Sequence, residues 1–516
     1  MLRKTGKAAW ISINFIRAQF LKTIRRPGRL VAIPMNLLRR LLVRAAAMLS
    51  FNLKRGGIFT DSATKLVAAL ASVDTEVHRH FEAGNALLDQ GRPLEAMEHY
   101  EWCLKHTKEP LIFYIASACL LVGLGRSDDS LLLLKRANEL RWDGVSPQFK
   151  KWRVLEGDFW ATVFGHSALI DYVIKLGILE GRQPHDTILY LPAHLRLANG
   201  FLVDQWRPHM KVAEKPEDLP FSPAIVPKIR FDYAGPLLED GNTSHLWEAA
   251  AKTYMRWYGE GRGPLLKLSD EVRDKGRAVL AKAGIPPDAW FVNLHMREIG
   301  SKQYHVQLHN VLNTNINAYF PAIEEVTRRG GWIVRLGDPS MTPMPPMPNV
   351  WDYCHSDVRS DWMDIFLCAE GRFLLGSSSG PAYVPPLYGV PSVLTNWWPP
   401  AQRPWHPQDL FLPKLYRMRN SGELLSLARS LSEPFGYCNA VDYLSSNFDV
   451  AVENNEPDYI LSAVVEMFER LEGTVHYTSD DLELRARADR IYEAHRAYGM
   501  GILARDFLKA YRAILD

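Results

Sequence analysis

The sequence lacks the short motifs that assign many enzymes to a class. It has no HExxH, GxxxxGK[ST] or GxGxxG motif and no DxD pair at a predicted strand end, which argues against zinc proteases, P-loop nucleotide hydrolases and dinucleotide-dependent enzymes. Its five cysteines are scattered and form no CxxC pair. This pattern argues against a structural zinc site and is typical of a reducing compartment. We therefore expect a mechanism with no metal and no bound cofactor.

Long apolar runs are also missing, and one part of the chain has no acidic residue. Residues 1–60 carry 13 Lys and Arg and no Asp or Glu. Apolar residues recur at helical spacing in residues 7–26 and 35–49, but arginines interrupt them before the ~20 residues that span a bilayer, and a signal peptide fits poorly. Such a basic amphipathic segment suits an anionic membrane surface; the alternative is a pair of helices packed on the body. We expect a cytoplasmic protein held peripherally at the inner face of the plasma membrane.

The rest of the chain has the composition of a large folded protein. Of its 516 residues, 47% are hydrophobic and 11% are aromatic, which allows a sizeable core and about three domains of ~150 residues each. Beyond residue 60 the chain holds 48 basic and 58 acidic residues. This mildly acidic body argues against binding to nucleic acid.

A repeat with a period of 34 residues follows the basic segment. Its matched positions are mostly small or apolar: Gly84, Gly91, Ala96, Tyr100 and Cys103 recur as Ala118, Gly125, Ser130, Leu134 and Ala137. This spacing is typical of paired helices in tetratricopeptide-like (TPR-like) repeats. We expect such repeats over residues 74–181, with a third helical pair at residues 148–181. The array either binds an acceptor or a protein partner or supports the body, on which it should pack because so few repeats are unstable alone.

Strand-like and helix-like segments then alternate. The expected strands are residues 187–191 and 209–213 in a first lobe (residues 186–270), and residues 290–295, 331–335 and 372–376 in a second lobe (residues 285–475). Turn-rich sequence near residues 260–288 separates the lobes, and helices are expected over residues 476–516. The alternation predicts an α/β protein with two Rossmann-like lobes, each built on a parallel sheet covered by helices.

Polar residues gather where the strands of the second lobe end. His295-Met-Arg297-Glu298 closes the first of these strands, Asp338 follows the second, and Gly376-Ser-Ser-Ser-Gly380 follows the third. The carboxyl ends of parallel strands meet at one edge of a sheet, which is where such sheets bind ligands. Residues of these types at that edge suit a phosphorylated ligand.

Arg297 and the serine loop, residues 376–380, are candidates for binding a diphosphate. The guanidinium can bind phosphate oxygens through two parallel hydrogen bonds, and a Ser-Gly loop at a helix start offers backbone N–H groups to an anion. Each has a structural alternative, an ion pair for the arginine and a helix N-cap for the serines. The loop also matches GxSxG, which would make Ser378 the nucleophile of a serine hydrolase with Asp449 and His476 as partners; nothing around those two residues marks a catalytic pair.

Three further residues near strand ends are weaker candidates. Asp338 could hold a hydroxyl or act as a base, or it could form an Asx turn before Pro339. His355 follows a short strand and could contact phosphate, or it could be a loop histidine with its own partner. Asn396 ends another strand and precedes Trp397 and Trp398, which could stack on a base or sugar or could pack in the core.

The segment from about residue 187 to 430 resembles a family of bacterial glycosyltransferases that carry helical repeats ahead of a two-lobed, GT-B-like catalytic region. The motifs that carry the resemblance are HMRE (295–298), GGWIVRLGDPSM (330–341), DYCHS (352–356), SDWMDIFLCA (360–369), FLLGSSSG (373–380), and GVP (389–391) followed by TN (395–396). More distantly, His295-x-Arg297 looks like the signature of fucosyltransferases whose Arg binds the diphosphate of GDP-fucose, and Arg196-Leu-Ala-Asn199 is loosely similar to their Gly-Asn turn. Glu298 replaces the second Arg of that signature, so GDP-fucose is only one donor option.

The residues and the resemblance together imply a glycosyltransferase that moves a sugar from a nucleotide-diphospho-sugar to a surface-glycan or lipid-linked acceptor. The diphosphate would be bound by Arg297, Ser377, Ser378, Ser379 and Gly380; the base would be Glu298 or Asp338; and the rest of the cleft would include His295, His355, Asn396, Arg196 and Asn199. One alternative is a non-catalytic, membrane-associated TPR scaffold that binds a partner or a phospho-sugar. Another is a hydrolase or phospho-sugar-processing enzyme on a similar sheet.

Overall fold

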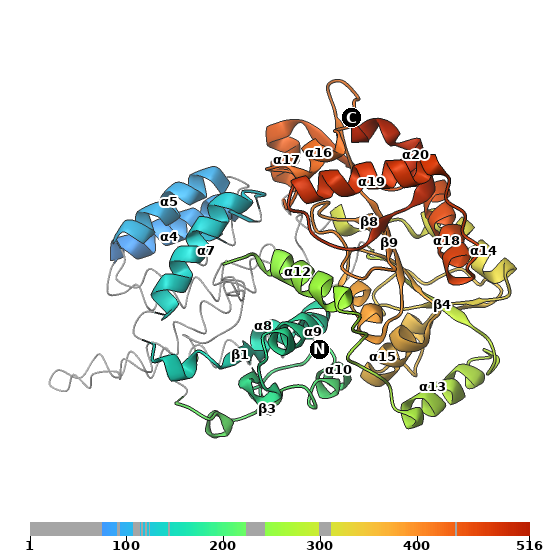
Figure 1. Ribbon diagram of the computed structural model, residues 1–516, viewed down its shortest axis with the longest axis horizontal. Coiled ribbons are helices and arrows are strands. Elements are labelled where there is room, and N and C mark those ends of the chain that lie inside the picture. The colour runs from blue at the N-terminus through green and yellow to red at the C-terminus, as the bar shows by residue number, and fades with distance from the viewer. Residues whose placement is uncertain are drawn as a thin grey trace.

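The computed structural model describes residues 75–89, 93–106, 124–142, 145–222, 243–298, 311–438 and 441–516, with isolated positions at 114, 117–118, 121–122 and 226. This part of the chain forms a helical region and two α/β lobes (Figure 1). The basic segment, residues 1–60, lies outside the described residues. None of the helices within the described ranges is long and apolar enough to cross a bilayer.

The smaller lobe is built on a parallel sheet of three strands in the order β1-β2-β3. The strands are β1 (Arg153–Glu156), β2 (Thr187–Tyr190) and β3 (Lys211–Ala213), and the helices around them are α8 (Gly157–Trp160), α9 (Phe164–Leu179), α10 (Gly200–Gln205) and α12 (Leu246–Gly259). Helix α9 is buried along almost its whole length. It therefore belongs to the core of the lobe.

This lobe begins earlier than the sequence predicted. Strand β1 and helix α9 lie inside residues 148–181, where a third pair of repeat helices was expected, and β1 pairs with β2 in parallel register, Val154 opposite Ile188. The prediction was wrong because an apolar run bounded by aromatic residues fits a buried strand and a buried helix equally well. The predicted repeats can therefore extend no further than the residues before β1.

The larger lobe is built on a parallel sheet of seven strands in the order β12-β9-β8-β7-β4-β5-β6. Its strands are β4 (Phe291–His295), β5 (Trp332–Arg335), β6 (Val350–Trp351), β7 (Leu374–Ser377), β8 (Ser392–Trp397), β9 (Leu410–Pro413) and β12 (Ile502–Leu503). Every residue of β4, β7, β8 and β9 is buried. Such continuous apolar runs form because helices cover both faces of a parallel sheet.

Two layers of helices enclose this sheet. On one face, an apolar cluster joins the sheet to α14 (Phe320–Arg328), α18 (Pro457–Leu471), α19 (Ser479–Ala494) and α20 (Arg505–Ala510). On the other face lie α13 (Asp270–Lys282) and α15 (Asp361–Glu370), whose apolar residues form one cluster with α9 and α12 of the smaller lobe. The two lobes thus share a hydrophobic core, and the chain is a doubly wound α/β protein of the predicted class.

The C-terminal segment differs from the prediction of helices alone. Strand β12 pairs with β9 and extends the large sheet at one edge, while α19 and α20 pack on its face. A separate antiparallel pair, β10 (Leu415–Met418) and β11 (Val450–Glu453), lies next to the short helices α16 (Leu427–Leu431) and α17 (Val441–Phe448). A strand of two residues carries too little pattern to be recognised from sequence.

The helical region consists of α4 (Thr75–Asp89), α5 (Pro93–His106) and α7 (Ser127–Trp142), beside the lobes in Figure 1. The repeat positions Tyr100, Cys103, Leu134 and Ala137 are buried. The TPR-like interpretation stays a prediction, because residues 107–123 are described at only a few positions. The region packs on the body: the N–H of Asp128 donates to Glu433 Oε1 at 2.9 Å.

Candidate active site

The ends of β4 and β7 meet at the point where the chain direction across the large sheet reverses. From β4 the chain adds β5 and β6 on one side, then crosses to β7 and adds β8, β9 and β12 on the other. His295 on β4 lies opposite Gly376 on β7. Just beyond, the N–H of Arg297 donates to Ser377 Oγ at 3.2 Å. Open α/β sheets bind ligands at such a switch point, in the crevice outside the carboxyl ends of the strands.

The hydroxyls of the serine loop hold the loop in place. Ser377 Oγ accepts from Arg297 N, Ser378 Oγ accepts from the N–H of Trp398 at 2.6 Å, and Ser379 Oγ donates to the carbonyl of Ser377 at 3.2 Å. An anion at this loop would therefore be bound mainly by backbone N–H groups. The hydrolase alternative gains no support, because Ser378 is not among the non-glycine residues with positive φ, as the strained turn of a nucleophile elbow would favour.

The helix expected after the serine loop is absent from this described segment. Two short 3₁₀ turns, η8 (Gly380–Tyr383) and η9 (Pro385–Tyr388), take its place. Prolines at 381, 385 and 386 cannot donate backbone hydrogen bonds and clash with a continuing helix. The loop therefore has no long helix behind it to add a dipole.

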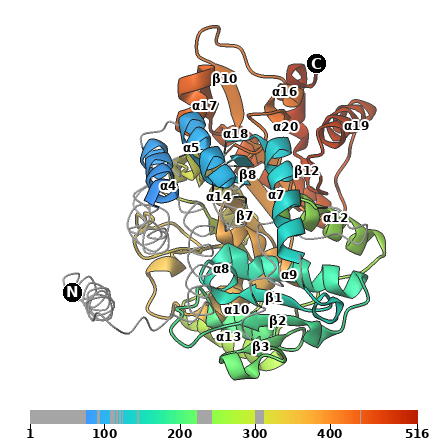
Figure 2. The same cartoon turned by 90° about the vertical axis from the view of Figure 1, so that its left-hand side faces the viewer.

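The N-terminus of helix α9, from the smaller lobe, lies against this loop instead. A Cβ on Gly380 would come within 2.9 Å of the backbone nitrogen of Gly165, and a Cβ on Gly165 within 3.0 Å of Gly380 Cα. Only residues without side chains allow so close an approach of two backbones. Helix α9 follows β1, so the carboxyl edges of the two parallel sheets face each other; Figure 2 shows α9 and β7 in the same part of the molecule. This arrangement is consistent with a GT-B-like fold.

A second contact joins the same two edges. Asn199 caps helix α10, its Oδ1 accepting from Leu202 N at 2.8 Å, while its Nδ2 donates to the carbonyl of Asp361 at 2.9 Å. The Asp361 carboxylate accepts from the N–H of Gly200 at 2.6 Å. Asn199 thus fastens the smaller lobe to the start of α15. Arg196 lies exposed in the same loop, between β2 and α10.

A buried arginine ties three strand ends together. Arg335, at the end of β5, is fully buried; it donates to Glu298 Oε1 at 2.5 Å and lies 3.4 Å from Asp352 Oδ1. The second oxygen of Glu298 accepts from the N–H of Thr342 at 2.9 Å. We call the group the Arg335 network; it consists of Arg335, Glu298, Asp352 and Thr342, with Met341 and Met344 of the loop after β5. As a base, Glu298 would first have to give up this ion pair.

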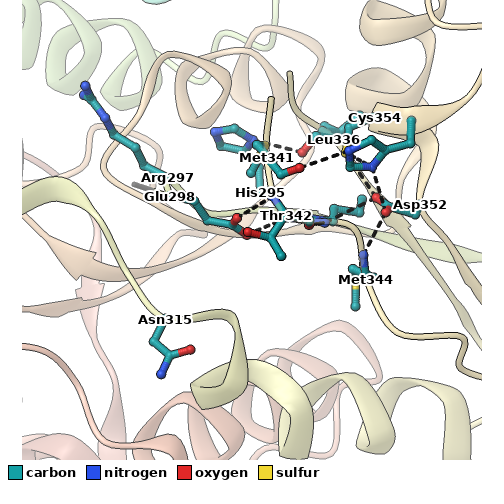
Figure 3. A network of polar contacts seen from close by, with 12 residues as sticks. His295, Arg297, Glu298, Asn315, Leu336, Met341, Thr342, Met344, Asp352 and Cys354 are labelled. Carbon is teal, nitrogen blue, oxygen red and sulfur yellow. Dashed lines mark hydrogen bonds and ion pairs between the residues drawn. The ribbon is translucent and has the colours of Figure 1, made fainter. Parts of the chain in front are cut away.

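Arg297 has a different orientation from its neighbour. In Figure 3 its side chain extends away from Glu298 and Asp352. The residue is half-buried. The neighbouring side chains of Arg297 and Glu298 thus point in different directions: Glu298 belongs to the Arg335 network, and the guanidinium of Arg297 is directed away from it.

His295 is buried at the end of β4, and its Nδ1 lies 3.1 Å from the carbonyl of Leu336. A carbonyl accepts only, so Nδ1 carries the proton and Nε2 keeps a lone pair. Burial, with smaller contributions from the charges of Arg335 and Arg297, lowers the pKa of His295 to about 4, although the hydrogen bond to Leu336 opposes the shift. The imidazole is therefore neutral at physiological pH, and it suits hydrogen-bond acceptance better than proton abstraction.

Asp338 follows β5 and is exposed, and its Oδ1 accepts from the N–H of Ser340 at 2.9 Å. This is the Asx-turn geometry weighed in the sequence, and it leaves the carboxylate at the carboxyl edge of the sheet. Nearby, His355 Nε2 lies 3.0 Å from the carbonyl of Met341 and its Nδ1 lies 2.9 Å from Asp352 Oδ2. His355 thus has partners of its own within the loop.

Asn396 is buried beneath the edge. It adopts positive φ, and it exchanges two hydrogen bonds with Asn455: its N–H donates to Asn455 Oδ1, and its Oδ1 accepts from Asn455 N at 2.7 Å. Trp397 and Trp398 are 2% and 3% exposed, which decides for core packing over stacking on a ligand. Asn396 and Trp397 thus end β8 inside the core, and Trp398 follows them there.

The sequence did not single out Arg335, Asp352 or Gly165. Arg335 ends a predicted strand, and Arg297 follows another. Only the order of strands in the sheet shows which carboxylates Arg335 contacts. Gly165 lies in a segment assigned to repeats. Among the described residues, a cavity of about 30 Å³ lies between α9 and η8, beside Tyr254 and Trp405, and another of about 220 Å³ lies beside Met467 and Arg470.

Comparisons with known proteins give remote structural likenesses. No protein-family model matches the sequence, and no curated protein matches it. A glycosyl transferase family 9 structure from Veillonella parvula aligns with 62% of this chain and 97% of its own, at 12% identity and a TM-score of 0.37. The iron-containing dodecameric glycosyltransferase TibC of enterotoxigenic E. coli aligns with 47% of this chain and 57% of its own, at 12% identity and a TM-score of 0.26.

TibC in complex with ADP-D-beta-D-heptose aligns with 48% of this chain and 58% of its own, at 10% identity and a TM-score of 0.26. All three solved structures are glycosyltransferases. At these identities and TM-scores, however, the likeness assigns neither a family nor an activity to this chain. The geometry of the sheet edge is therefore the basis for the function proposed below.

Proposed function

We propose that the protein is a glycosyltransferase that transfers a sugar from a nucleotide-diphospho-sugar to a surface-glycan or lipid-linked acceptor. The observation that carries this proposal is the convergence of Arg297 and the serine loop at the switch point between β4 and β7. This is the place where a doubly wound sheet binds a ligand, and a guanidinium beside backbone N–H groups is suited to phosphate.

The facing lobe supplies the second half of the proposal. The N-terminus of α9 meets the serine loop at Gly165 and Gly380, and helix N-termini favour negative charge. A diphosphate at the crevice would therefore meet Arg297 from one lobe and the start of α9 from the other. A reaction that joins two substrates suits a site between two lobes, with the acceptor on the side of the smaller lobe.

The residues then divide into roles. Arg297 and the backbone of the serine loop would stabilise the charge that develops on the departing nucleoside diphosphate, the role that a metal ion fills in other transferases. Asp338 is exposed at the same edge and is the stronger candidate for the base that takes the proton of the acceptor hydroxyl. Glu298 would position the edge through Arg335. His295 would accept a hydrogen bond through Nε2.

The direct test is binding and turnover with a panel of nucleotides. Thermal-shift and calorimetric titration against GDP, UDP, ADP and CMP would identify the nucleobase of the donor. Release of free nucleotide from the matching nucleotide-sugar would establish transfer or hydrolysis of the donor. GDP-fucose belongs in the panel. A protein that binds no nucleotide of the panel would favour the non-catalytic scaffold, in which the TPR-like helices bind a protein partner.

We also propose that the basic segment, residues 1–60, holds the enzyme at the anionic inner face of the plasma membrane. Its 13 basic residues would each contribute about 1 kcal/mol near such a surface. Removal of residues 1–56 should release the protein from vesicles of anionic lipid, and moderate salt should weaken binding of the full chain. Failure of the full chain to bind these vesicles at low salt would contradict the proposal.

A further inference from the structure

A cluster of three potential metal ligands lies at the end of β6, two strands away from the crevice between β4 and β7. Cys354 Sγ lies 3.1 Å from Asp352 Oδ1 and 3.2 Å from His355 Nδ1, and His355 Nδ1 lies 2.9 Å from Asp352 Oδ2. In these three residues, one ligand atom of each lies within 4.8 Å of the other two, and among the described residues these are the His, Cys and carboxylate side chains that form such a group of three or more. Figure 3 shows Cys354 and Asp352 side by side.

The ligand atoms of the three side chains lie close to the spacing that a metal requires. In a tetrahedral zinc site, Zn–S of about 2.3 Å and Zn–N or Zn–O of about 2.0–2.2 Å place ligand atoms roughly 3.4–3.6 Å apart. Cys354 Sγ and His355 Nδ1 lie 3.2 Å apart, and Asp352 turns a different oxygen toward each of them, Oδ1 toward Sγ and Oδ2 toward Nδ1. One ligand atom from each of the three residues lies within 4.8 Å of the other two. A small outward rotation of the three side chains would therefore admit an ion with one open coordination position.

The hydrogen bonds around His355 prepare it as a ligand. Its Nε2 lies 3.0 Å from the carbonyl of Met341, which only accepts, so Nε2 carries a proton. A metal-binding histidine commonly donates its other N–H to such a carbonyl, which fixes the orientation of the ring. Nδ1 lies 2.9 Å from the Asp352 carboxylate, which also only accepts, so a proton or a cation must lie between these two atoms, and a bound metal ion would take that place.

Charge also favours a divalent ion. The Arg335 network holds two carboxylates, Glu298 and Asp352, against one buried guanidinium. With Cys354 as a thiolate, the group carries a charge of about −2, which a divalent cation neutralises. A thiolate with an imidazole selects Zn²⁺ over Mg²⁺ or Ca²⁺, which prefer oxygen ligands.

We propose that Asp352, Cys354 and His355 bind a single Zn²⁺ ion that orders the loop after β5. His355 contacts the carbonyl of Met341, and Asp352 accepts from the N–H of Met344 at 3.0 Å. The ion thus fixes the loop that also carries Asp338, while lying outside the crevice where the diphosphate is placed. Its ligands are not among the groups proposed to bind the donor, so binding of the ion can be measured without turnover.

The test is metal binding by the full-length protein after chelation and reduction. Zn²⁺ is titrated against a competing chromogenic chelator, and Co²⁺ is added to look for the thiolate-to-cobalt charge-transfer band. We expect one ion per chain and a band that disappears in Cys354→Ser, whose hydroxyl can still donate to Asp352. Zn²⁺ affinity should fall in Cys354→Ser and in His355→Ala by at least the roughly 10- to 100-fold that loss of a hydrogen-bond partner of a metal ligand costs.

The matched control is Cys438→Ser, at another buried cysteine, which should keep both the affinity and the band. Hydrogen exchange gives a second readout: Zn²⁺ should slow exchange of the Thr342 and Met344 amides in the unaltered protein but not in Cys354→Ser. Absence of Zn²⁺ binding, or equal affinity in the unaltered protein and in both folded variants, would overturn the proposal. Neither measurement uses turnover, so the result stands apart from that of the proposed function.

Discussion

The main-chain N–H of Arg297 donates a hydrogen bond to Ser377 Oγ across 3.2 Å. Arg297 lies two residues beyond the end of β4, and Ser377 is the last residue of β7. The bond therefore fastens together the two strand ends that border the switch point of the large sheet. It also fixes the backbone from which the Arg297 side chain extends.

The first prediction concerns the approach of the two lobes at Gly380. In Gly380→Ala, the new Cβ would lie 2.9 Å from the backbone nitrogen of Gly165, and backbone cannot move aside cheaply. We expect a loss of about 1–3 kcal/mol in the free energy of unfolding together with weaker nucleotide binding. Urea unfolding and nucleotide titration measure the two effects.

Gly259→Ala is the matched control, because no atom lies within 4 Å of a Cβ built at that position. It should leave nucleotide affinity unchanged. If Gly380→Ala behaves like Gly259→Ala in both measurements, the lobes do not meet at the serine loop as described.

A second prediction separates the two candidate bases. Glu298→Gln removes the main charge partner of the buried Arg335, and we expect a loss on the order of 3 kcal/mol in the free energy of unfolding. Asp338→Asn alters an exposed residue and should change stability by no more than about 0.5 kcal/mol. If Asp338 is the base, turnover should fall by roughly 10²- to 10⁴-fold. Full turnover in Asp338→Asn would remove it from the mechanism.

The strands were predictable from the sequence, but the partners at their ends were not. The predicted strands of residues 290–295, 331–335 and 372–376 correspond to β4, β5 and β7 within two residues, because continuous apolar runs bounded by turns identify buried parallel strands. Glu298 was interpreted as a candidate catalytic base. Its ion pair depends on β5 lying beside β4, which is a property of sheet order and has no local sequence signal.

The same distinction explains the other differences. The serine and glycine pattern of residues 376–380 predicted a helix after the serine loop. The prolines that follow, Pro381, Pro385 and Pro386, favour the 3₁₀ turns that the structure has there. Asn396 was interpreted as a cleft residue because it follows a strand; its reciprocal bonds with Asn455 join segments 59 residues apart. Long-range pairs of this kind cannot be derived from spacing along the chain.

A third prediction concerns pH. The pKa of His295 is lowered to about 4 from the usual 6.5, so the unfolded state binds this proton more tightly than the folded state. Its contribution to stability is complete above pH 6.5 and is lost as the pH falls toward 4. Between pH 7 and pH 5 the loss should be about 2 kcal/mol.

His295→Asn keeps a donor for the Leu336 carbonyl and removes the titrating group, so it should flatten this dependence. His185→Asn, at an exposed histidine, is the control and should leave the dependence as it is. The free energy of unfolding in urea at pH 5 and pH 7 provides the comparison. Equal slopes in all three proteins would show that His295 is not held neutral by burial.

In the proposed mechanism Arg297 binds the diphosphate of a nucleotide. Nucleotide affinity and melting temperature, both measured in Arg297→Lys and Arg297→Ala, decide whether it does. Lysine keeps the charge but loses the planar pair of donors, so Arg297→Lys should still cost about 1–3 kcal/mol of nucleoside-diphosphate binding. The melting temperature of the free protein should stay nearly unchanged. Arg328→Lys, at an arginine that is 69% exposed and paired with Glu325, is the control. Nucleotide affinity unchanged in both Arg297 variants would contradict the account.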